Sequence, residues 1–494
     1  MTTGSSYGFP AHQMVYVPYI ENSMGIIADS HHKYASGYFN ATYTYDSRYN
    51  IFGSFRKDYA DVYGLNAKFR GKPLWSVGAG WIVSNESFMK DVTWVNFLKL
   101  RLSYGVTGNI YQGATSYMTA SSGDLNRHTN QPYGTITSPA NPNLKWEQNR
   151  TTNIGVDFSL LNNRLRGAVD IYNKVGKDIF APVTLDPTTG FTSMVKNVAS
   201  MKNNGVELQL TYDWLRAQSR ESFGWTTNLT NSYNKNKITY VENPSTLAYQ
   251  LINNRYVTGY PTSAIWSYRF AGISQDIAYT YDPSDINHEN PLKNEEGSYI
   301  VDKGGAGETL WYSDNDNKVH AAQSGSVDIL EYSGQSEPKT ILGIDNTFQW
   351  NGFSLGVLLA YYGGHVMRAL AETETFDVPP TAVARYFANG WDMETNPDST
   401  TPGIGLFCSS TIGREPSYSN ISIRKADFLK IRNIVLGYDF PSKWISPLGI
   451  NRLSLRFQID NPKWLWIAND VNVDPETLGI RQPTSFIFGL NINL

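Results

Sequence analysis

The chain contains long stretches in which large apolar side chains alternate with small or polar ones. In residues 485–494, every second side chain is large and apolar, namely Phe486, Phe488, Leu490, Ile492 and Leu494. A period of two places successive side chains on opposite faces of an extended strand. The same pattern recurs in residues 98–104, 154–160, 165–171, 206–212, 353–359 and 453–459. The alternation therefore predicts an all-β chain made of two-faced strands.

The second face of these strands carries full charges, on Arg101, Asp157, Arg166, Asp170, Glu207, Arg456 and Asp460. A charged face requires water, whereas a face of large apolar side chains suits hydrocarbon. We expect runs of about 9–12 residues, longer than the usual soluble strand and suited to a tilted membrane-spanning strand. The pattern predicts a transmembrane antiparallel β-barrel with an aqueous interior.

The connections between the runs alternate in length. Asn351-Gly352 and Asn162-Asn163 suit tight turns, because Asn and Gly accept a positive φ. The long connections are predicted at residues 108–149, 176–203, 363–426 and 461–482. This alternation is typical of short periplasmic turns and long extracellular loops, and the length of the chain predicts roughly 14 spanning strands. It also requires the irregular segment 234–340 to contain zero or an even number of spanning strands.

Composition excludes several other classes. The 494 residues hold 41 Lys and Arg against 44 Asp and Glu, so a basic surface for nucleic acid is not expected. Cys408 is the single cysteine, which excludes an internal disulfide. Apolar runs fall short of the roughly 20 residues that a transmembrane helix needs.

Tryptophans fall at or near the ends of the predicted strands, at Trp75, Trp81, Trp214, Trp350, Trp444, Trp464 and Trp466. Indole rings, with one polar edge, favour the boundary between lipid headgroups and hydrocarbon. We interpret them as an interfacial aromatic girdle. The alternative is that strand ends in any large β protein carry aromatic residues.

Several segments, in the same order, resemble the C-terminal barrel portion of the SusC/RagA family of TonB-linked outer-membrane transporters of Bacteroidetes. They include NPNLKWEQNRTTNIGVDFSLLNNRLRGAVDIYNKVGKDIF (141–180), ADFLKIRNIVLGYDFPSKW (426–444), INRLSLRFQIDNPKWLW (450–466) and PTSFIFGLNINL (483–494). The resemblance implies a barrel of about 22 strands, of which this chain would supply a part. We expect residues 34–494 to be the C-terminal part of that barrel and residues 1–33 the remnant of a preceding loop or strand. The plug, the TonB box and the signal peptide are expected to be absent from this chain.

The resemblance also implies a function. It predicts active import of oligosaccharides or oligopeptides across the outer membrane of a Gram-negative bacterium, without a cofactor and without enzymatic chemistry. The implied partners are a SusD-like surface lipoprotein and the TonB–ExbB–ExbD complex. Two alternatives stay open, namely a passive porin or adhesin-type barrel and a soluble carbohydrate-binding β protein.

Candidate ligand-binding residues are few. Trp311 and Trp391 lie in predicted external loops, where an indole ring can stack on a sugar ring, although packing of the loops together or against a partner protein is the simpler explanation. Asp314 and Asp316 have the spacing of oxygen ligands, but the central Gly and the distal Glu of a calcium loop are missing, which favours a solvated loop. The letters GSSYG (4–8) lack the strand and helix of a nucleophile turn, so we predict no catalytic residue.

Overall fold

The structure of the protein is a computed structural model. It describes residues 33–60, 71–111, 116–126, 128–191, 193–252, 256–273, 278–279, 301–302, 309–312, 318–319, 327–368, 418–470, 473–478 and 482–493. These residues include no helix that is long and apolar enough to cross a membrane. The chain divides into two compact units, residues 1–80, 102–152 and 174–201, and residues 81–101, 153–173 and 202–494.

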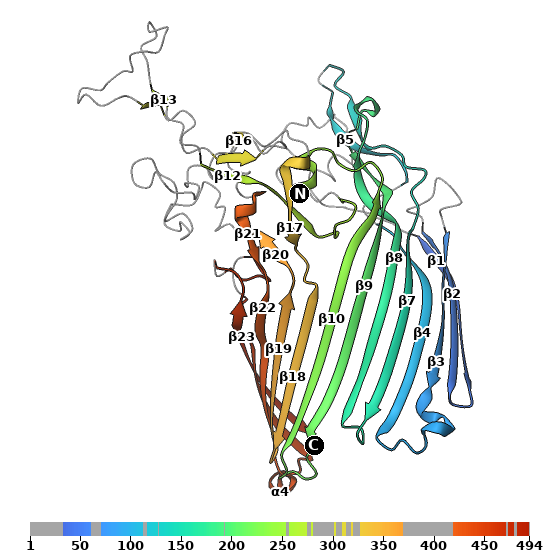
Figure 1. Cartoon of the computed structure of the whole chain (residues 1–494), viewed down its shortest axis with the longest axis vertical. Coiled ribbons are helices and arrows are strands. Elements are labelled where there is room, and N and C mark those ends of the chain that lie inside the picture. Colours follow the sequence, from blue (N-terminus) through green and yellow to red (C-terminus); the bar gives the residue numbers. More distant parts are fainter. Residues whose placement is uncertain are drawn as a thin grey trace, which may run out of the picture. The chain divides into compact units, whose positions relative to one another are not determined.

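Thirteen strands of the described chain form one large sheet, in the order β1-β2-β3-β4-β7-β8-β9-β10-β18-β19-β22-β23-β24 (Figure 1). The strands are β1 (Tyr34–Tyr45), β2 (Tyr49–Ala60), β3 (Gly71–Ile82), β4 (Val95–Asn109), β7 (Glu147–Leu160), β8 (Leu165–Thr184), β9 (Ser193–Leu215), β10 (Gly224–Val241), β18 (Thr340–Trp350), β19 (Phe353–Gly363), β22 (Phe428–Asp439), β23 (Arg452–Ile467) and β24 (Ser485–Asn493). Neighbouring strands with a defined register run antiparallel. The predicted all-β class is confirmed.

Several strands are longer than the expected run. β8 has 20 residues and β9 has 23, so the long loop predicted at 176–203 is wrong, and residues 185–192 make that connection. β23 likewise continues to Ile467, which corrects the loop predicted to begin at residue 461. The reason is that the backbone ladder continues wherever a neighbouring strand offers partners, even after the apolar alternation has faded into Asn and Lys residues.

The predicted tight turns are confirmed. Asn351 and Gly352 connect β18 to β19 with φ of 49° and 86°. Asn162 and Asn163, with φ of 58° and 59°, lie in the turn between β7 and β8. Because β10 pairs directly with β18, the described residues between them add no strand to the large sheet, in agreement with the parity requirement.

The connections contain short elements of their own. The small sheets combine β5 (Thr119–Leu125) with β6 (Pro132–Ser138), β11 (Ala264–Tyr268) with β17 (Leu330–Gln335), β13 (Ala278–Tyr279) with β14 (Val301–Asp302), β20 (Val366–Arg368) with β21 (Ile423–Lys425), and β12 (Phe270–Ile273) with β15 (Thr309–Tyr312) and β16 (Lys318–Val319). Among the described residues, the helices are α2 (Ala248–Ile252) and α4 (Ser442–Ile445), with 3₁₀ turns η3 (Val83–Asn85), η4 (Ser87–Met89), η5 (Pro187–Thr189), η6 (Val327–Ile329), η10 (Asn420–Ser422) and η11 (Ser446–Leu448).

The largest buried apolar cluster of the described residues lies in these connections. It joins α2, β11, η6 and β17 through Ala248, Leu251, Tyr268, Ile329 and Leu330. The strands of the large sheet contribute none of these side chains. A water-excluding core therefore fixes part of the long connection between β10 and β18, whereas the large sheet exposes apolar side chains.

Candidate functional site

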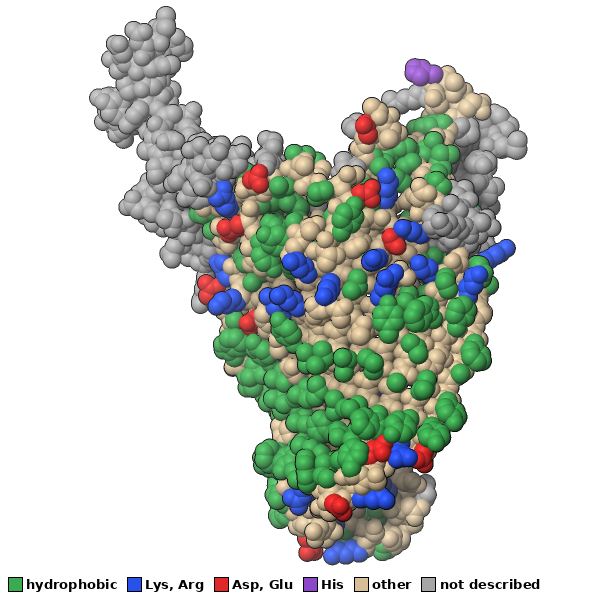
Figure 2. Space-filling view, turned by 45° about the vertical axis from the view of Figure 1, so that its right-hand side comes forward, with side chains coloured by type: hydrophobic (Ala, Val, Ile, Leu, Met, Phe, Trp, Pro, Cys, Tyr) green, Lys and Arg blue, Asp and Glu red, His purple; other side chains and the backbone are tan. Residues whose placement is uncertain are grey.

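One face of the large sheet is apolar. Leu455 of β23 pairs with Leu490 of β24 and Tyr438 of β22, and Phe457 pairs with Phe488. The rings of Phe457 and Phe488 lie 4.8 Å apart, and Leu455 remains 47% exposed. We call this the apolar face; on β22 to β24 its residues are Ile434, Leu436, Tyr438, Leu453, Leu455, Phe457, Ile459, Phe486, Phe488, Leu490 and Ile492. Figure 2 shows hydrophobic side chains gathered in a broad area, with charged side chains grouped beyond its ends.

The opposite side of the same strands is the polar face. On β23, Arg456 Nη2 donates to Gln458 Oε1 at 2.6 Å, and Gln458 Nε2 donates to Asp460 Oδ1 at 2.7 Å. Two glycines, Gly437 and Gly489, lie opposite Arg456 on the neighbouring strands. Small neighbours leave room for the guanidinium to lie along the sheet. The predicted alternation of a charged face with an apolar face is confirmed on these strands.

A three-residue ion cluster lies on the polar face of β4, β7 and β8. Arg101 Nε and Nη2 donate to the two carboxylate oxygens of Asp157, both at 2.8 Å, and Nη2 also donates to Asp170 at 2.9 Å. Asn153 Nδ2 donates to the second Asp170 oxygen at 2.8 Å. A bidentate guanidinium–carboxylate pair fixes both the charge and the orientation of the side chains. The cluster thus joins three strands across the polar face.

Gly155 makes room for this cluster. A Cβ atom at position 155 would lie 2.6 Å from the guanidinium of Arg101 and 2.6 Å from Asp170 Oδ1. Carbon atoms do not approach polar atoms so closely without displacement. Glycine at this strand position therefore serves the close approach of Arg101 to the backbone of β7.

A second cluster centres on Asp213 of β9, which is 8% exposed. Its carboxylate accepts hydrogen bonds from Arg166 at 2.9 Å, Arg216 at 3.1 Å and the Thr226 hydroxyl at 3.1 Å. Farther along β9, the Thr211 hydroxyl and Asn228 of β10 are hydrogen-bonded at 2.9 Å. Sequence reasoning missed Asp213, although it continues the polar-face alternation of Glu207 and Thr211. The polar face is a hydrogen-bonded surface on which these opposite charges are mutually compensated.

An aromatic group occupies the apolar face where β9, β10, β18, β19 and β22 meet their short turns. The ring of Trp214 stacks on Trp225 at 5.0 Å, and Trp225 stacks on Phe348 at 5.6 Å. Phe353 and Tyr438 approach to 4.4 Å. Five of the seven tryptophans in the predicted girdle are at least 42% exposed, namely Trp75, Trp214, Trp350, Trp444 and Trp466. Trp81 is half-buried, and the side chain of Trp464 lies outside the described residues. Exposure of these rings agrees with the girdle interpretation.

Polar atoms among these rings have partners. Trp214 Nε1 donates to Thr227 Oγ1 at 3.0 Å, and Trp225 Nε1 donates to Asn346 Oδ1 at 3.1 Å. The Thr227 hydroxyl also donates to Asn346 Oδ1 at 2.6 Å. Such pairing satisfies polar groups where water is scarce.

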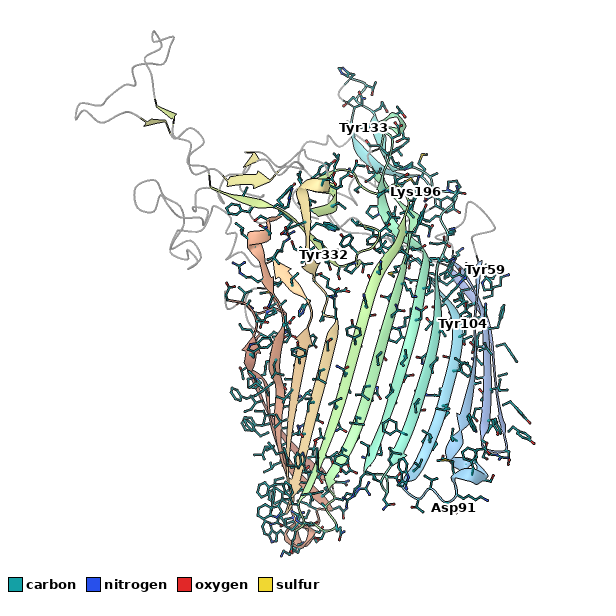
Figure 3. The ribbon with its side chains drawn as sticks, in the orientation of Figure 1. Tyr59, Asp91, Tyr104, Tyr133, Lys196 and Tyr332 are labelled. Carbon is teal, nitrogen blue, oxygen red and sulfur yellow. The ribbon has the colours of Figure 1, made fainter. Side chains whose placement is uncertain are left out.

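A second aromatic group lies in the connection between β10 and β18. Trp266 of β11 is 4.7 Å from Tyr260 and 5.8 Å from Tyr332 of β17, measured between ring centroids. Figure 3 shows Tyr332 in the upper half of the view and Asp91 at the bottom, and burial raises the pKa of Tyr332. Arg368 lies over the Tyr418 ring at 5.1 Å, and burial lowers its pKa to about 10. Trp266 and Tyr418, the latter from the connection between β19 and β22, pack against the apolar cluster of α2, β11, η6 and β17 and form a folded platform with it.

A short strap, residues 473–478, is held against β22. Glu476 accepts hydrogen bonds from Lys430 at 2.8 Å and from Arg432 at 3.0 Å, and Lys430 is only 2% exposed. Burial by itself raises the pKa of Glu476, but the hydrogen bonds from Arg432 and Lys430 lower the pKa by more. The pKa of Glu476 therefore lies below its ordinary value. Within the strap, the Leu478 amide donates to the Asp474 carbonyl at 2.8 Å. The sequence pattern gave no indication of this contact.

Of the sequence-predicted ligand residues, Trp311 alone lies within the described part of the chain. The backbone of Trp311 pairs with Phe270 and Val319 in the β12-β15-β16 sheet. Trp391, Asp314 and Asp316 lie outside the described residues, so their predicted roles stay untested. In the part of the chain that the structure describes, no group of three or more His, Cys, Asp or Glu side chains could hold a metal ion.

Comparison with known proteins identifies the family. The model of the TonB dependent receptor-like β-barrel family matches residues 2–307, more than half of the chain. The chain belongs to this family of outer-membrane barrels, which confirms the resemblance seen in the sequence. The two-faced strands and alternating connections agree with that assignment.

Individual relatives are distant and longer. The chain is 27% identical to TonB-dependent receptor P39 of Formosa agariphila, over 95% of this chain and 47% of the relative. It is 24% identical to the TonB-dependent receptor SusC of Bacteroides thetaiotaomicron, over 75% of this chain and 34% of the relative. The solved RagAB peptide transporter shares the fold with a TM-score of 0.72 and 22% identity, over 93% of this chain and 47% of that chain. The chain spans about half the length of the curated relatives it matches, or less.

Proposed function

We propose that residues 34–494 form part of the barrel of a TonB-dependent outer-membrane transporter that imports oligosaccharides or oligopeptides. The observation that carries this proposal is the division of the sheet into an apolar face and a hydrogen-bonded, charge-paired polar face. Lipid favours the first and a water-filled interior favours the second. Membership of the TonB-dependent receptor family supports the same conclusion.

The polar face would serve as the wall of the passage. The clusters around Arg101 and Asp213 present hydroxyl, amide and mutually compensated charged groups, which can exchange hydrogen bonds with a hydrated ligand. Such a wall neither forms nor breaks a covalent bond of the ligand. The function is therefore passage, and binding along the wall needs to be weak enough for release.

The long connections would face the cell exterior and meet the ligand first. The platform of Tyr260, Trp266 and Tyr332 can support a ligand-binding loop, and Trp311 and Trp391 remain the proposed stacking residues. We propose a SusD-like surface lipoprotein as the partner on this side and the TonB–ExbB–ExbD complex as the source of energy. The name of the relative SusC, a TonB-dependent receptor, supports the receptor class. The name of the RagAB peptide transporter supports a peptide as one possible class of substrate.

Uptake measurements test the proposal. Cells with and without the gene that encodes this chain are given fluorescent oligosaccharides in one experiment and fluorescent oligopeptides in another. We expect gene-dependent, proton-gradient-dependent accumulation of one class, and recovery of the protein in the outer-membrane fraction. Uptake that persists after collapse of the proton gradient identifies a passive porin and contradicts active import. Recovery of folded protein from the soluble fraction contradicts the membrane assignment itself.

A further inference from the structure

Three lysines, Lys202 of β9 and Lys235 and Lys237 of β10, lie in two neighbouring rows. A row here is the set of side chains that lie opposite one another on adjacent strands. Hydrogen bonds between Asn236 and Asn203 at 2.7 Å, and between Thr211 and Asn228 at 2.9 Å, fix the register of these strands. In an antiparallel pair, equal steps in opposite directions lead from one facing pair to the next. One step from Asn203 and Asn236 therefore places Lys202 opposite Lys237. The step in the other direction places Asn204 opposite Lys235.

The lysines belong to the apolar face. On β9, Lys202 has the same parity as Val206 and Trp214, and on β10 Lys235 and Lys237 have the parity of Trp225 and Tyr233. All three lysines are exposed, whereas Asn234, Asn236 and Ile238 between and beside them on β10 are partly or fully buried. Asn173 of β8 extends the row of Asn204 and Lys235 by donating a hydrogen bond to Asn204. We call Asn173, Asn204, Lys235, Lys202 and Lys237 the basic rows.

The arrangement costs stability unless an anion neutralises it. Like charges directly opposite each other on neighbouring strands repel. Within the described residues, Lys202, Lys235 and Lys237 make no ion pair with an Asp or Glu side chain, in contrast to Arg101, Arg166 and Arg432. Their ammonium groups are therefore available to an external ligand with negative charge.

The surroundings define the chemistry of that ligand. Toward the turns, the next side chains on the same face are Ile171, Val206 and Tyr233, which are 54%, 40% and 42% exposed. Toward the other end, the strands continue into the long connections. A ligand in contact with both rows and the apolar residues needs an anionic headgroup joined to hydrocarbon. The amides of Asn173 and Asn204, beside the lysines, suit the hydroxyl groups of a sugar.

We propose that the basic rows bind the phosphorylated headgroup of a glycolipid in the membrane leaflet next to the long connections. This inference rests on the proposed membrane location. The lysines donate charge-assisted hydrogen bonds to phosphate oxygens, and the acyl chains lie along Ile171, Val206 and Tyr233. Basic side chains gathered beyond one end of the hydrophobic area are visible in Figure 2. The bound lipid offsets the repulsion between Lys202 and Lys237.

A binding experiment with two lipids tests the assignment. The full receptor that contains this chain is purified in detergent and titrated with diphosphorylated lipid A and with the same lipid after removal of its phosphates. We expect tighter binding of the phosphorylated form. Each interfacial lysine contributes about fivefold to the affinity for an anionic lipid, so K202Q/K237Q should weaken binding of the phosphorylated lipid by about 25-fold. K235Q alone should weaken it by about fivefold.

The control is K90Q/K443Q, which removes two exposed lysines outside the rows, one next to η4 and one in α4, and should leave both affinities unchanged. Heat-dependent gel migration verifies that each variant is folded. Equal binding of the two lipids by the native protein, or native affinity in K202Q/K237Q, overturns the site. Displacement of the lipid by inorganic phosphate would assign the rows to a small anion and also overturn it. Failure of ligand uptake leaves this binding measurement unaffected, so the two proposals fail separately.

Discussion

At the residue scale, the polar face depends on carboxylates that each serve several donors. Asp213 accepts from Arg166, Arg216 and Thr226, and Asp170 accepts from Arg101 and Asn153. A carboxylate has enough acceptor sites for such sharing. One side chain therefore holds groups from several strands, and its loss leaves more than one donor without a partner.

Asp213→Asn should reveal this dependence. The substitution leaves Arg166 and Arg216 without their negative partner, and because both arginines are partly exposed we expect a loss of about 1–2 kcal/mol. The temperature at which heat-dependent gel migration changes measures the effect. Arg452→Gln is the control, because its contact with Asp439 is largely exposed. Equal shifts for the two variants would show that burial of Asp213 is unimportant.

At the element scale, short turns and the strap fix the ends of the strands. The turn at Gly352 has a positive φ of 86°, and a Cβ there would lie 2.7 Å from the Asp439 carbonyl oxygen. Arg220 also donates to that oxygen, so the turns after β9, β18 and β22 meet at one point. Both the backbone conformation and the lack of space require glycine at this position.

Gly352→Ala should therefore destabilise the protein more than Gly449→Ala. Gly449 also has a positive φ, of 73°, but nothing lies within 4 Å of a Cβ at that position. Backbone strain alone costs about 1 kcal/mol, and we expect at least twice that loss for position 352. Chemical denaturation of the refolded proteins measures the difference. A similar loss for both variants would mean that the contact with Asp439 can relax.

The strap should respond to acid through Glu476. The pKa of Glu476 is lower in the folded protein than in the unfolded chain. The stabilising effect of its carboxylate is therefore fully present above the ordinary glutamate pKa of about 4.3, and it is lost as pH falls through the lower pKa of the folded protein. The protection of the Leu478 amide against hydrogen exchange, relative to the unfolded chain at the same pH, should fall over that range. In Glu476→Gln this protection should be low at all pH values. Asp470→Asn, which alters the contact of the largely exposed Asp470 carboxylate with Arg424, should behave like the native protein. Protection of the Leu478 amide that stays constant as pH falls contradicts this role.

At the scale of the whole molecule, the sheet separates two environments. Leu455 is on the apolar face and Gln458, three residues later on the same strand, is on the polar face. A lysine on a lipid-facing position near the middle of a bilayer costs about 2–4 kcal/mol, whereas a lysine on the interior face of a barrel is hydrated. The two positions therefore offer a matched comparison.

Leu455→Lys should sharply reduce the amount of folded protein in the outer membrane, and Gln458→Lys should leave most of it. Quantitative immunoblotting of membrane fractions before and after heating measures the folded share. An equal reduction of the folded share by the two substitutions contradicts the assignment of the faces. A larger reduction by Gln458→Lys would reverse that assignment.

Local pattern accounts for much of this architecture. Alternation around Leu455, Leu208 and Phe486 predicted the two faces, and the positive φ that Asn and Gly accept predicted the turn at Asn351-Gly352. These features depend on neighbours in the chain, because a strand has a period of two whatever its partner. Asp213 could also have been assigned to the polar face from its parity.

Only the tertiary structure decided which distant residues meet. Arg101 pairs with carboxylates 56 and 69 residues away, and Glu476 reaches Lys430 across 46 residues. It also decided that β9 extends back to Ser193, and that Lys202 lies opposite Lys237. Register and strand length depend on hydrogen bonds to the neighbouring strand, and a single-strand pattern carries no information about which residue of that neighbour lies opposite.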